Sequence, residues 1–386
     1  MNYTPDPDHP LTTACPYFPP EEREWLKREL GEILAGKLSM GPRVRRFEEA
    51  FAALCGAAHG VAFPSGTSSL EAALLALGTK PGDEVLVPVE TFVATGMAVH
   101  LAGATPVFVE TSPEAFGMDF DDARRRLTPR TRGALVVHFG GFIAPGIDRF
   151  AAELKSAGRF LIEDCAHAHG ATLGGRPAGS FGDAGCFSFY PTKMMTTGEG
   201  GMLVTSDAQL AAGARSLQNR GMDMDAGGEL YVRAGRNNRF TEIAAALGLS
   251  QLRCLPDFLA ARRRVAAVYD GVLRDGPFFR PLLPGPGAAP SYWRYTLVAE
   301  RPFDRPALRD RLTARGVHVD WPYDPLLHLQ PSLRALYGGA PGDRPVSEDL
   351  AARHLCLPMH ARLRDADARY VAESVRDEAR RLGGGA

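Results

Sequence analysis

Lys193 is the residue of this sequence best suited to act as an amine nucleophile. Lysine occurs at only five positions, and arginine provides the other permanently charged basic side chains. A guanidinium group does not deprotonate in proteins, so arginine cannot replace lysine where an amine must attack. Lys193 lies among aromatic, hydroxyl and glycine residues in FSFYPTKMMTTGEGG, with Ser188 five residues before it. Burial there would lower the pKa of the amine and favour imine formation near neutral pH. An ordinary surface lysine is the alternative.

A hydroxyl-rich segment predicts a site for a phosphate group. In PSGTSSLEAALLAL, residues Gly66, Thr67 and Ser68 stand where a short strand would turn into a helix. The first amides of a helix have no internal partners, and with the helix dipole and nearby hydroxyls they attract an anion. A simple helix cap is the alternative for this segment taken alone.

An acidic pair in LIEDCAHAHGA closes a predicted buried strand. A carboxylate at the end of such a strand tends to face a ligand crevice. It can also keep the pyridine nitrogen of an electron-sink cofactor protonated, and Asp164 is the candidate for that role. His167 and His169 raise the possibility of a metal, but no third ligand of suitable spacing lies nearby, so we expect no metal site.

The composition excludes several classes of protein. With 44 basic and 45 acidic residues the net charge is −1, which gives no field to attract nucleic acid or an anionic membrane. No apolar run approaches the ~20 residues of a membrane helix, and the N-terminus lacks the features of a secretory signal. The six cysteines form no Cys-x-x-Cys pair. We therefore expect a cytoplasmic protein with reduced thiols and no membrane or nucleic-acid partner.

The elements that must position these residues alternate between strands and helices. Apolar runs such as GVAF, EVLVPV, RGALVVHF and RFLIED predict strands, with helical patterns between them. This alternation predicts an α/β fold whose mostly parallel sheet is covered on both faces. After Asp164 the pattern changes, because CFSFY and GMLVTSD predict strands joined by a glycine-rich turn. Neither a Gly-x-Gly-x-x-Gly nor a Gly-x-Ser-x-Gly motif is present in a suitable place, so nicotinamide binding and serine hydrolysis are not indicated.

The same patterns suggest a division into three parts. We expect an N-terminal segment at 1–38, a large domain at 39–250, and a linking helix with a smaller α+β domain at 251–386. A long helix is predicted at 240–274, with a bend or break near Pro256. Beyond the linker PLLPGPGAAP, strands are predicted in SYWRYTLVAE and VHVDW, and helices near 347–355 and 365–382.

Together these segments resemble the DegT/StrS-type family of sugar aminotransferases, which are pyridoxal-phosphate-dependent enzymes of fold type I. The resemblance runs from about residue 39 to the C-terminus. It is carried by FPSGTSSLEAALLALG, DEVLVPVETFVATGMAV, IEDCAHAHGA, GSFGDAGCFSFYPTK, GEGGMLVTSD and RNNRFTEIAAALGLSQL. It implies a large pyridoxal-phosphate-binding domain with a mostly parallel seven-stranded sheet flanked by helices, followed by a smaller C-terminal α+β domain.

The resemblance also implies roles for individual residues. Two would be catalytic: Lys193, joined to the cofactor as a Schiff base, and Asp164, paired with its pyridinium nitrogen. The others would bind the cofactor: Phe92 stacks on its ring, His167 lies near its ring hydroxyl, and Gly66, Thr67, Ser68 and Ser188 hold its phosphate.

Three further residues are candidates outside this group. Asn237, in GRNNRF, resembles an asparagine that reaches the phosphate from the neighbouring subunit, which implies a homodimer with shared active sites. Arg239 is a candidate for the donor's carboxylate. His328 is a candidate for substrate contact, with a structural histidine as the alternative.

The implied reaction moves an amino group from L-glutamate or L-glutamine to a keto sugar, and the expected acceptors are nucleotide-linked hexoses. Lysine at position 193 favours transamination over the deoxygenation of related sugar dehydratases, which carry histidine there. Three alternatives stay open: a keto-cyclitol acceptor as in aminoglycoside pathways, a catalytically silent relative that binds the cofactor as a regulator or partner subunit, and another fold-type-I activity such as β-elimination.

Overall fold

The computed structural model describes residue 6 and residues 10–223 and 229–383. At its centre lies a seven-stranded sheet with the order β1-β9-β8-β5-β4-β2-β3. The strands are β1 (His59–Phe63), β2 (Glu84–Pro88), β3 (Thr105–Val109), β4 (Thr131–Val137), β5 (Phe160–Asp164), β8 (Ala184–Ser188) and β9 (Gly201–Thr205). β9 pairs antiparallel with both neighbours, and the other neighbouring strands are parallel. The expected mostly parallel sheet is confirmed.

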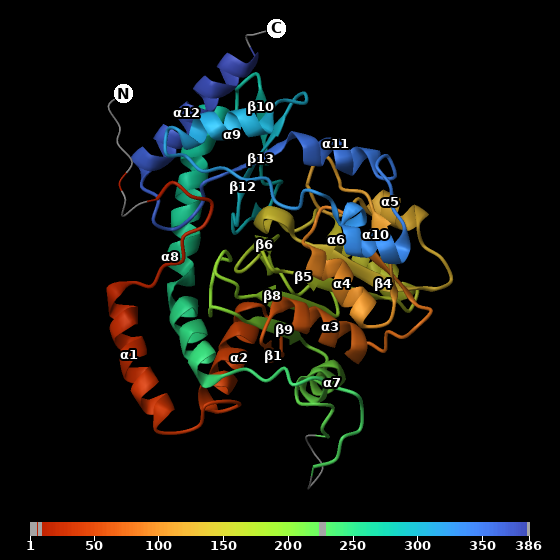
Figure 1. Ribbon diagram of the computed structural model, residues 1–386. Helices are drawn as coiled ribbons and strands as arrows, with labels where there is room; N and C mark the ends of the chain where they lie inside the picture. The colour runs from red at the N-terminus through yellow and green to blue at the C-terminus, as the bar shows by residue number, and fades with distance from the viewer. Residues whose placement is uncertain (1–5, 7–9, 224–228, 384–386) are drawn as a thin grey trace.

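Helices cover both faces of this sheet (Figure 1), as the continuous apolar strands predict. Side chains alternate along each strand, so Val61, Val85 and Leu135 join one core and Ala62, Leu86 and Val136 join the other. The first core contains residues of α3 (Gly66–Ala76), α4 (Val93–Leu101) and α7 (Ala208–Gln218). The second contains residues of α2 (Pro42–Leu54) and α6 (Ile147–Ser156). α5 (Phe120–Arg125) also lies in this domain.

A smaller C-terminal domain has its own core around the sheet β10-β12-β13. These strands are β10 (Phe279–Pro281), β12 (Tyr295–Ala299) and β13 (His354–Leu357). The helices of this part of the chain are α9 (Arg305–Thr313), α10 (Pro331–Tyr337), α11 (Pro345–Arg353) and α12 (Asp365–Gly383). The remaining elements are two short 3-10 turns, η1 (Phe139–Gly141) and η2 (Leu327–Leu329), and a third small sheet of β6 (Thr172–Leu173), β7 (Arg176–Pro177) and β11 (Ala288–Ala289).

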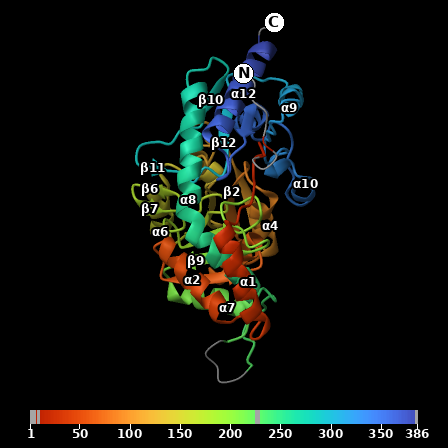
Figure 2. The same ribbon diagram turned by 90° about the vertical axis from the view of Figure 1, so that its left-hand side faces the viewer.

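The long helix α8 (Glu242–Leu273) connects the two domains, and Figures 1 and 2 show it running along the side of the molecule from the large domain to the small one. By length and composition alone it could cross a membrane, but half of its apolar window is buried inside the protein. It packs against α2, α12 and α1 (Pro20–Leu34), as the core helix of a globular protein does. The boundary expected at residue 250 falls inside this helix.

Two local predictions need correction. The long helix was expected to bend or break near Pro256, and α8 runs through that residue without a break. Its packing along both domains offsets the ~3 kcal/mol that an interior proline costs a helix. VHVDW, at 317–321, forms no strand and contributes one isolated bridge, between Asp320 and Cys356. β12 pairs with β10 and with β13, and the sequence did not identify the residues of β13, His354–Leu357, as a strand. The expected absence of disulfides agrees with the six free cysteines.

Candidate active site

The carboxyl ends of β1, β2, β5 and β8 lead into one cavity of about 390 Å³. Ligand crevices form at this edge of a parallel sheet. Seven of the residues expected in the site line the cavity: Gly66, Thr67, Phe92, Asp164, His167, Ser188 and Lys193. The fold thus brings together segments that are separated by up to 127 residues in the sequence.

Asp164 ends β5 and is nearly buried. Its Oδ2 accepts a hydrogen bond of 2.9 Å from the Thr95 hydroxyl, and its Oδ1 accepts one of 3.1 Å from the Ala166 amide. Burial raises the pKa of Asp164, whereas these two donors and the nearby Lys193 lower it. The carboxylate is therefore held in a fixed orientation at the end of the strand.

Lys193 lies in the turn after β8, half-buried at the wall of the cavity. Burial lowers the pKa of its amine to about 7, Asp164 opposes this shift, and Arg294 adds to it. Its Nζ lies 4.7 Å from the ring centroid of Trp293. A large fraction of such amines is neutral at physiological pH, which a nucleophilic amine requires.

The N-terminus of α3 and Ser188 of β8 form a polar corner of the cavity. Ser65 caps the helix, since its Oγ accepts a hydrogen bond of 3.1 Å from the Ser68 amide. A Cβ on Gly66 would lie 2.9 Å from Cβ of Ser188, so only glycine lets the helix approach β8 this closely. The resulting corner combines the first amides of a helix with the Thr67 and Ser188 hydroxyls, which suits an anion.

Aromatic side chains form much of the remaining wall. Trp293 stacks on His167 with ring centroids 3.6 Å apart, and the Tyr323 hydroxyl lies 2.8 Å from Nε2 of His167. Phe92 is 57% exposed, and its ring centroid lies 6.2 Å from that of Tyr323. The exposed side chain of Tyr190 also lines the cavity.

Sequence reasoning missed Thr95, Trp293 and Tyr323. Thr95 lies in the ETFVAT segment, three residues after Phe92, so helical spacing could have suggested it. Trp293 and Tyr323 come from the C-terminal part of the chain, where no local motif marks them.

Four expected site residues do not line the cavity. The amide and hydroxyl of Ser68 are both engaged with the Ser65 side chain. Asn237 is exposed, and Arg239 donates a 3.4 Å hydrogen bond to Asn219. His328 is buried, with its Nε2 3.1 Å from Oε1 of Glu348. A structural histidine would make such a contact with Glu348, and the roles of all four residues stay predictions.

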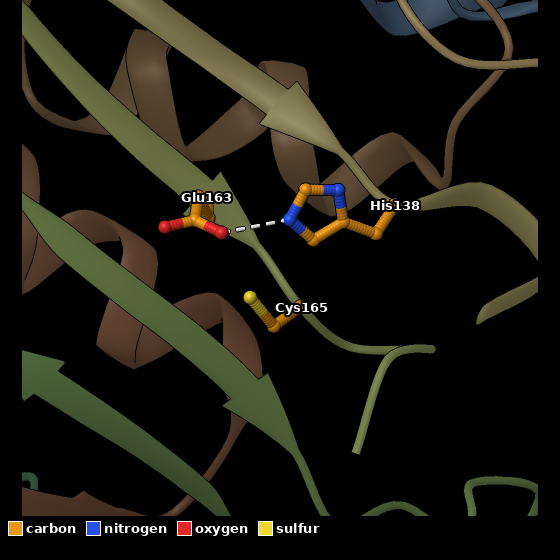
Figure 3. Close-up of side chains that lie close together, drawn as sticks. All are labelled: His138, Glu163 and Cys165. Carbon is orange, nitrogen blue, oxygen red and sulfur yellow. Dashed lines mark hydrogen bonds and ion pairs between the residues drawn. The ribbon is translucent and has the colours of Figure 1, made fainter. Parts of the chain in front are cut away.

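Three residues that do not line the cavity, His138, Glu163 and Cys165, lie close enough together to suggest a metal centre (Figure 3). However, both oxygens of Glu163 already accept hydrogen bonds. Oε1 accepts from the amides of Phe181 and Gly182 at 2.6 and 2.8 Å, and Oε2 accepts from the Gly179 amide at 2.9 Å and lies 2.8 Å from Nε2 of His138. These contacts tie the 179–182 segment to β5, so the group is a structural network with no free carboxylate oxygen for a metal ion.

Comparison with known proteins agrees with this geometry. The family model described as the DegT/DnrJ/EryC1/StrS aminotransferase family matches residues 20–376. The chain is 35% identical over 369 residues to a GDP-perosamine synthase of Caulobacter vibrioides, which covers 95% of this chain and 97% of that protein. It is 36% identical over 351 residues to a dTDP-3-amino-3,4,6-trideoxy-alpha-D-glucose transaminase of Streptomyces venezuelae, covering 90% of each.

A solved structure with the same architecture is that of the aminotransferase TlmJ from Streptoalloteichus hindustanus. The TM-score is 0.87 at 33% sequence identity, covering 97% of this chain and 100% of that one. Similarity of this extent covers both domains and the whole cavity.

Proposed function

Because the chain belongs to the DegT/DnrJ/EryC1/StrS aminotransferase family, it is a pyridoxal-phosphate-dependent aminotransferase, and we propose that it aminates a nucleotide-linked keto sugar at the expense of L-glutamate or L-glutamine. The observation that carries this proposal is the convergence of the Lys193 amine and the Asp164 carboxylate in one cavity. We place the enzyme in the cytoplasm, where its six cysteines remain reduced.

The side chains of the cavity fit the cofactor at each of its polar groups. Lys193 would hold it covalently through Nζ, and the corner of Gly66, Thr67 and Ser188 would bind its phosphate. Asp164 would pair with the protonated ring nitrogen. Nδ1 of His167 is buried and has no partner among the described residues, so it is available to the ring oxygen. Phe92, at the start of α4, offers an aromatic face for the ring.

When bound, pyridoxal phosphate supplies an electron sink for the negative charge that develops at the donor's α-carbon. The protein's own residues direct the protons. Nζ of Lys193, with its pKa near 7, takes the α-proton of the donor in one half-reaction and returns a proton to the acceptor carbon in the other. The Asp164 carboxylate would hold a proton on the ring nitrogen, and the hydrogen bonds from Thr95 and Ala166 favour its ionised form and keep it aligned.

The wall of the cavity supports a sugar as the acceptor. Phe92, Tyr190 and Tyr323 line it with aromatic rings, and the apolar face of a sugar ring packs well against such surfaces. The names of the two relatives above describe proteins that act in the formation of nucleotide-linked amino sugars. We carry that substrate class over to this chain.

The exposed surface near Asn237 supports a homodimer with shared active sites. Leu230, Tyr231 and Val232 are 49–60% exposed, and they precede Asn237 on a segment that projects from the large domain in Figure 1. Exposed apolar residues grouped in this way are typical of protein interfaces. A second copy of the chain would cover them and could receive Asn237 at its phosphate corner.

The test is a two-stage assay of the purified protein. With L-glutamate or L-glutamine alone, the enzyme should form one equivalent of keto acid per site and then stop. Addition of nucleotide-linked 3-keto or 4-keto hexoses should restart turnover with ping-pong kinetics. A response only to keto-cyclitols would replace the proposed acceptor, continuous keto-acid release without any acceptor would indicate elimination, and no keto acid would indicate a silent relative.

A further inference from the structure

His167 and Tyr323 form a hydrogen-bonded pair of rings whose planes are nearly parallel. The Tyr323 hydroxyl lies 2.8 Å from Nε2 of His167, although the two residues are 156 positions apart. The ring planes differ by only 5°, with centroids 6.0 Å apart. The 2.8 Å distance lies in the usual range for a hydrogen bond between a hydroxyl and a ring nitrogen.

Neighbouring side chains hold this pair in place. Trp293 stacks on His167 with its plane tilted by 6°, and Phe139 packs edge-on against both His167 and Tyr323. Cζ of Arg294 lies 4.1 Å from the centroid of the Trp293 ring. Because His167 already occupies one face of that ring, the guanidinium of Arg294 lies on the opposite face. Arg294 is fixed in turn by the Thr13 carbonyl at 2.8 Å and by Asp320 at 3.2 Å.

The backbone of Tyr323 is also specialised. Its φ is 70°, in the left-handed region that residues other than glycine seldom adopt. Strained residues of this kind concentrate at functional sites, where the surrounding structure enforces them. In this backbone conformation the Tyr323 side chain lines the cavity and contacts His167.

The hydrogen bond decides which nitrogen of His167 carries a proton. Burial, with help from the charges of Lys193 and Arg294, lowers the pKa of His167 well below its usual value, so the ring is neutral and has one N–H. Among the described residues, the only recorded hydrogen-bond partner of the Tyr323 hydroxyl is Nε2 of His167. If the Tyr323 hydroxyl donates its proton to Nε2, the single proton of the neutral imidazole lies on Nδ1.

We propose that Tyr323 is a positioning residue that acts through His167: it fixes the tautomer in which Nδ1–H is a hydrogen-bond donor to the negatively charged ring oxygen of the cofactor. This inference rests on the proposed function only for the identity of the acceptor oxygen. The tautomer itself is a property of the protein without cofactor.

The first experiment observes that tautomer in the cofactor-free protein. Nitrogen NMR of protein labelled in its histidine rings should show a protonated Nδ1 and an unprotonated Nε2 for His167, identified by their loss in His167→Gln. Tyr323→Phe should convert these signals to those of mixed tautomers. The matched control is Tyr337→Phe, which removes a hydroxyl 2.7 Å from Nδ1 of His100 outside the cavity and should leave the His167 signals unchanged. A His167 tautomer that is the same with and without the Tyr323 hydroxyl would overturn the proposal.

The second experiment measures the coupling between the two residues during cofactor binding. Tyr323→Phe should lower the affinity for pyridoxal phosphate about tenfold, which is the equivalent of one buried hydrogen bond. In a His167→Gln background the same substitution should lower that affinity by less than about twofold, because a glutamine amide donates a hydrogen bond without depending on a tautomer. An equal loss in both backgrounds would show that Tyr323 acts independently of His167. Failure of the wild-type protein to bind the cofactor would instead contradict the proposed function and leave the tautomer result standing.

Discussion

Thr95 and Asp164 join the first turn of α4 to the end of β5 through a hydrogen bond of 2.9 Å. Thr95 in turn lies 2.8 Å from the Thr91 hydroxyl, so a chain of two hydroxyls ends on the carboxylate. The bond opposes the effect of burial, which raises the pKa of Asp164. The hydrogen bond therefore favours the ionised form of the carboxylate at the end of β5.

Replacing Thr95 with valine should weaken the reaction most strongly in acid. Loss of the hydroxyl removes a donor that lowers the pKa of Asp164, so that pKa rises further and the carboxylate is protonated at higher pH. The acid limb of the pH–rate profile for the donor half-reaction should move to higher pH. On that limb the rate should fall about five- to tenfold. Thr95→Ser should behave as wild type. An unchanged limb in Thr95→Val would show that Thr95 does not maintain the charge of Asp164.

Gly66→Ala should lower cofactor affinity by at least about tenfold, because a Cβ at 2.9 Å from Cβ of Ser188 would force α3 away from β8. Equilibrium titration of the cofactor-free variant with pyridoxal phosphate measures the effect. Gly271→Ala in α8 is the control, since nothing lies within 4 Å of its added Cβ, and it should bind normally. Normal affinity in Gly66→Ala would place the phosphate elsewhere.

Subunit mixing tests the shared active site. Asn237→Ala and Lys193→Ala homodimers should each be nearly inactive. After the two are mixed, dissociated and reassociated, heterodimers would contain one site with both native residues. About a quarter of wild-type activity should return, as expected from random pairing and one intact site per heterodimer. If no activity returns although mass spectrometry detects heterodimers, Asn237 serves its own chain or neither.

The depressed pKa of Lys193 should appear in the stability of the cofactor-free protein. Between about 7 and 10.5 the unfolded chain carries a protonated Lys193 and the folded chain a neutral one. The unfolded state thus binds more protons, and the free energy of unfolding rises with pH across this window, by at most about 1.4 kcal/mol per pH unit. Lys193→Met should therefore be more stable than wild type near pH 7, and the two should converge toward pH 10.5. The free energy of unfolding of both proteins is measured by urea denaturation at several pH values. A difference between them that does not change with pH would refute the pKa shift.

The sequence predicted those parts of the site that local motifs encode. The polar corner that would bind the phosphate, Asp164 and Lys193 each lie in a segment that leads from a strand into a loop. The residue types in these segments indicate the chemistry that they can perform. Parallel strands place their carboxyl ends at one edge, so the convergence of these segments followed from the fold class.

The remaining parts depend on contacts between distant segments. Trp293 and Tyr323 reach the cavity only because the small domain packs against the large one, and the tautomer of His167 depends on that packing. The contact of His328 with Glu348 and the uninterrupted course of α8 through Pro256 are likewise tertiary effects. Neither can be deduced from periodicity or from a single residue's preference.

The most direct test of the account is borohydride reduction of the purified protein followed by peptide mapping. A cofactor joined to lysine as a Schiff base should absorb visible light, and reduction should abolish this absorbance. It should leave one pyridoxyl group per chain, on the peptide that contains Lys193, with the other four lysines unmodified. A pyridoxyl group on another lysine, or on none, would contradict the assignment of Lys193 and with it the proposed chemistry of the cavity.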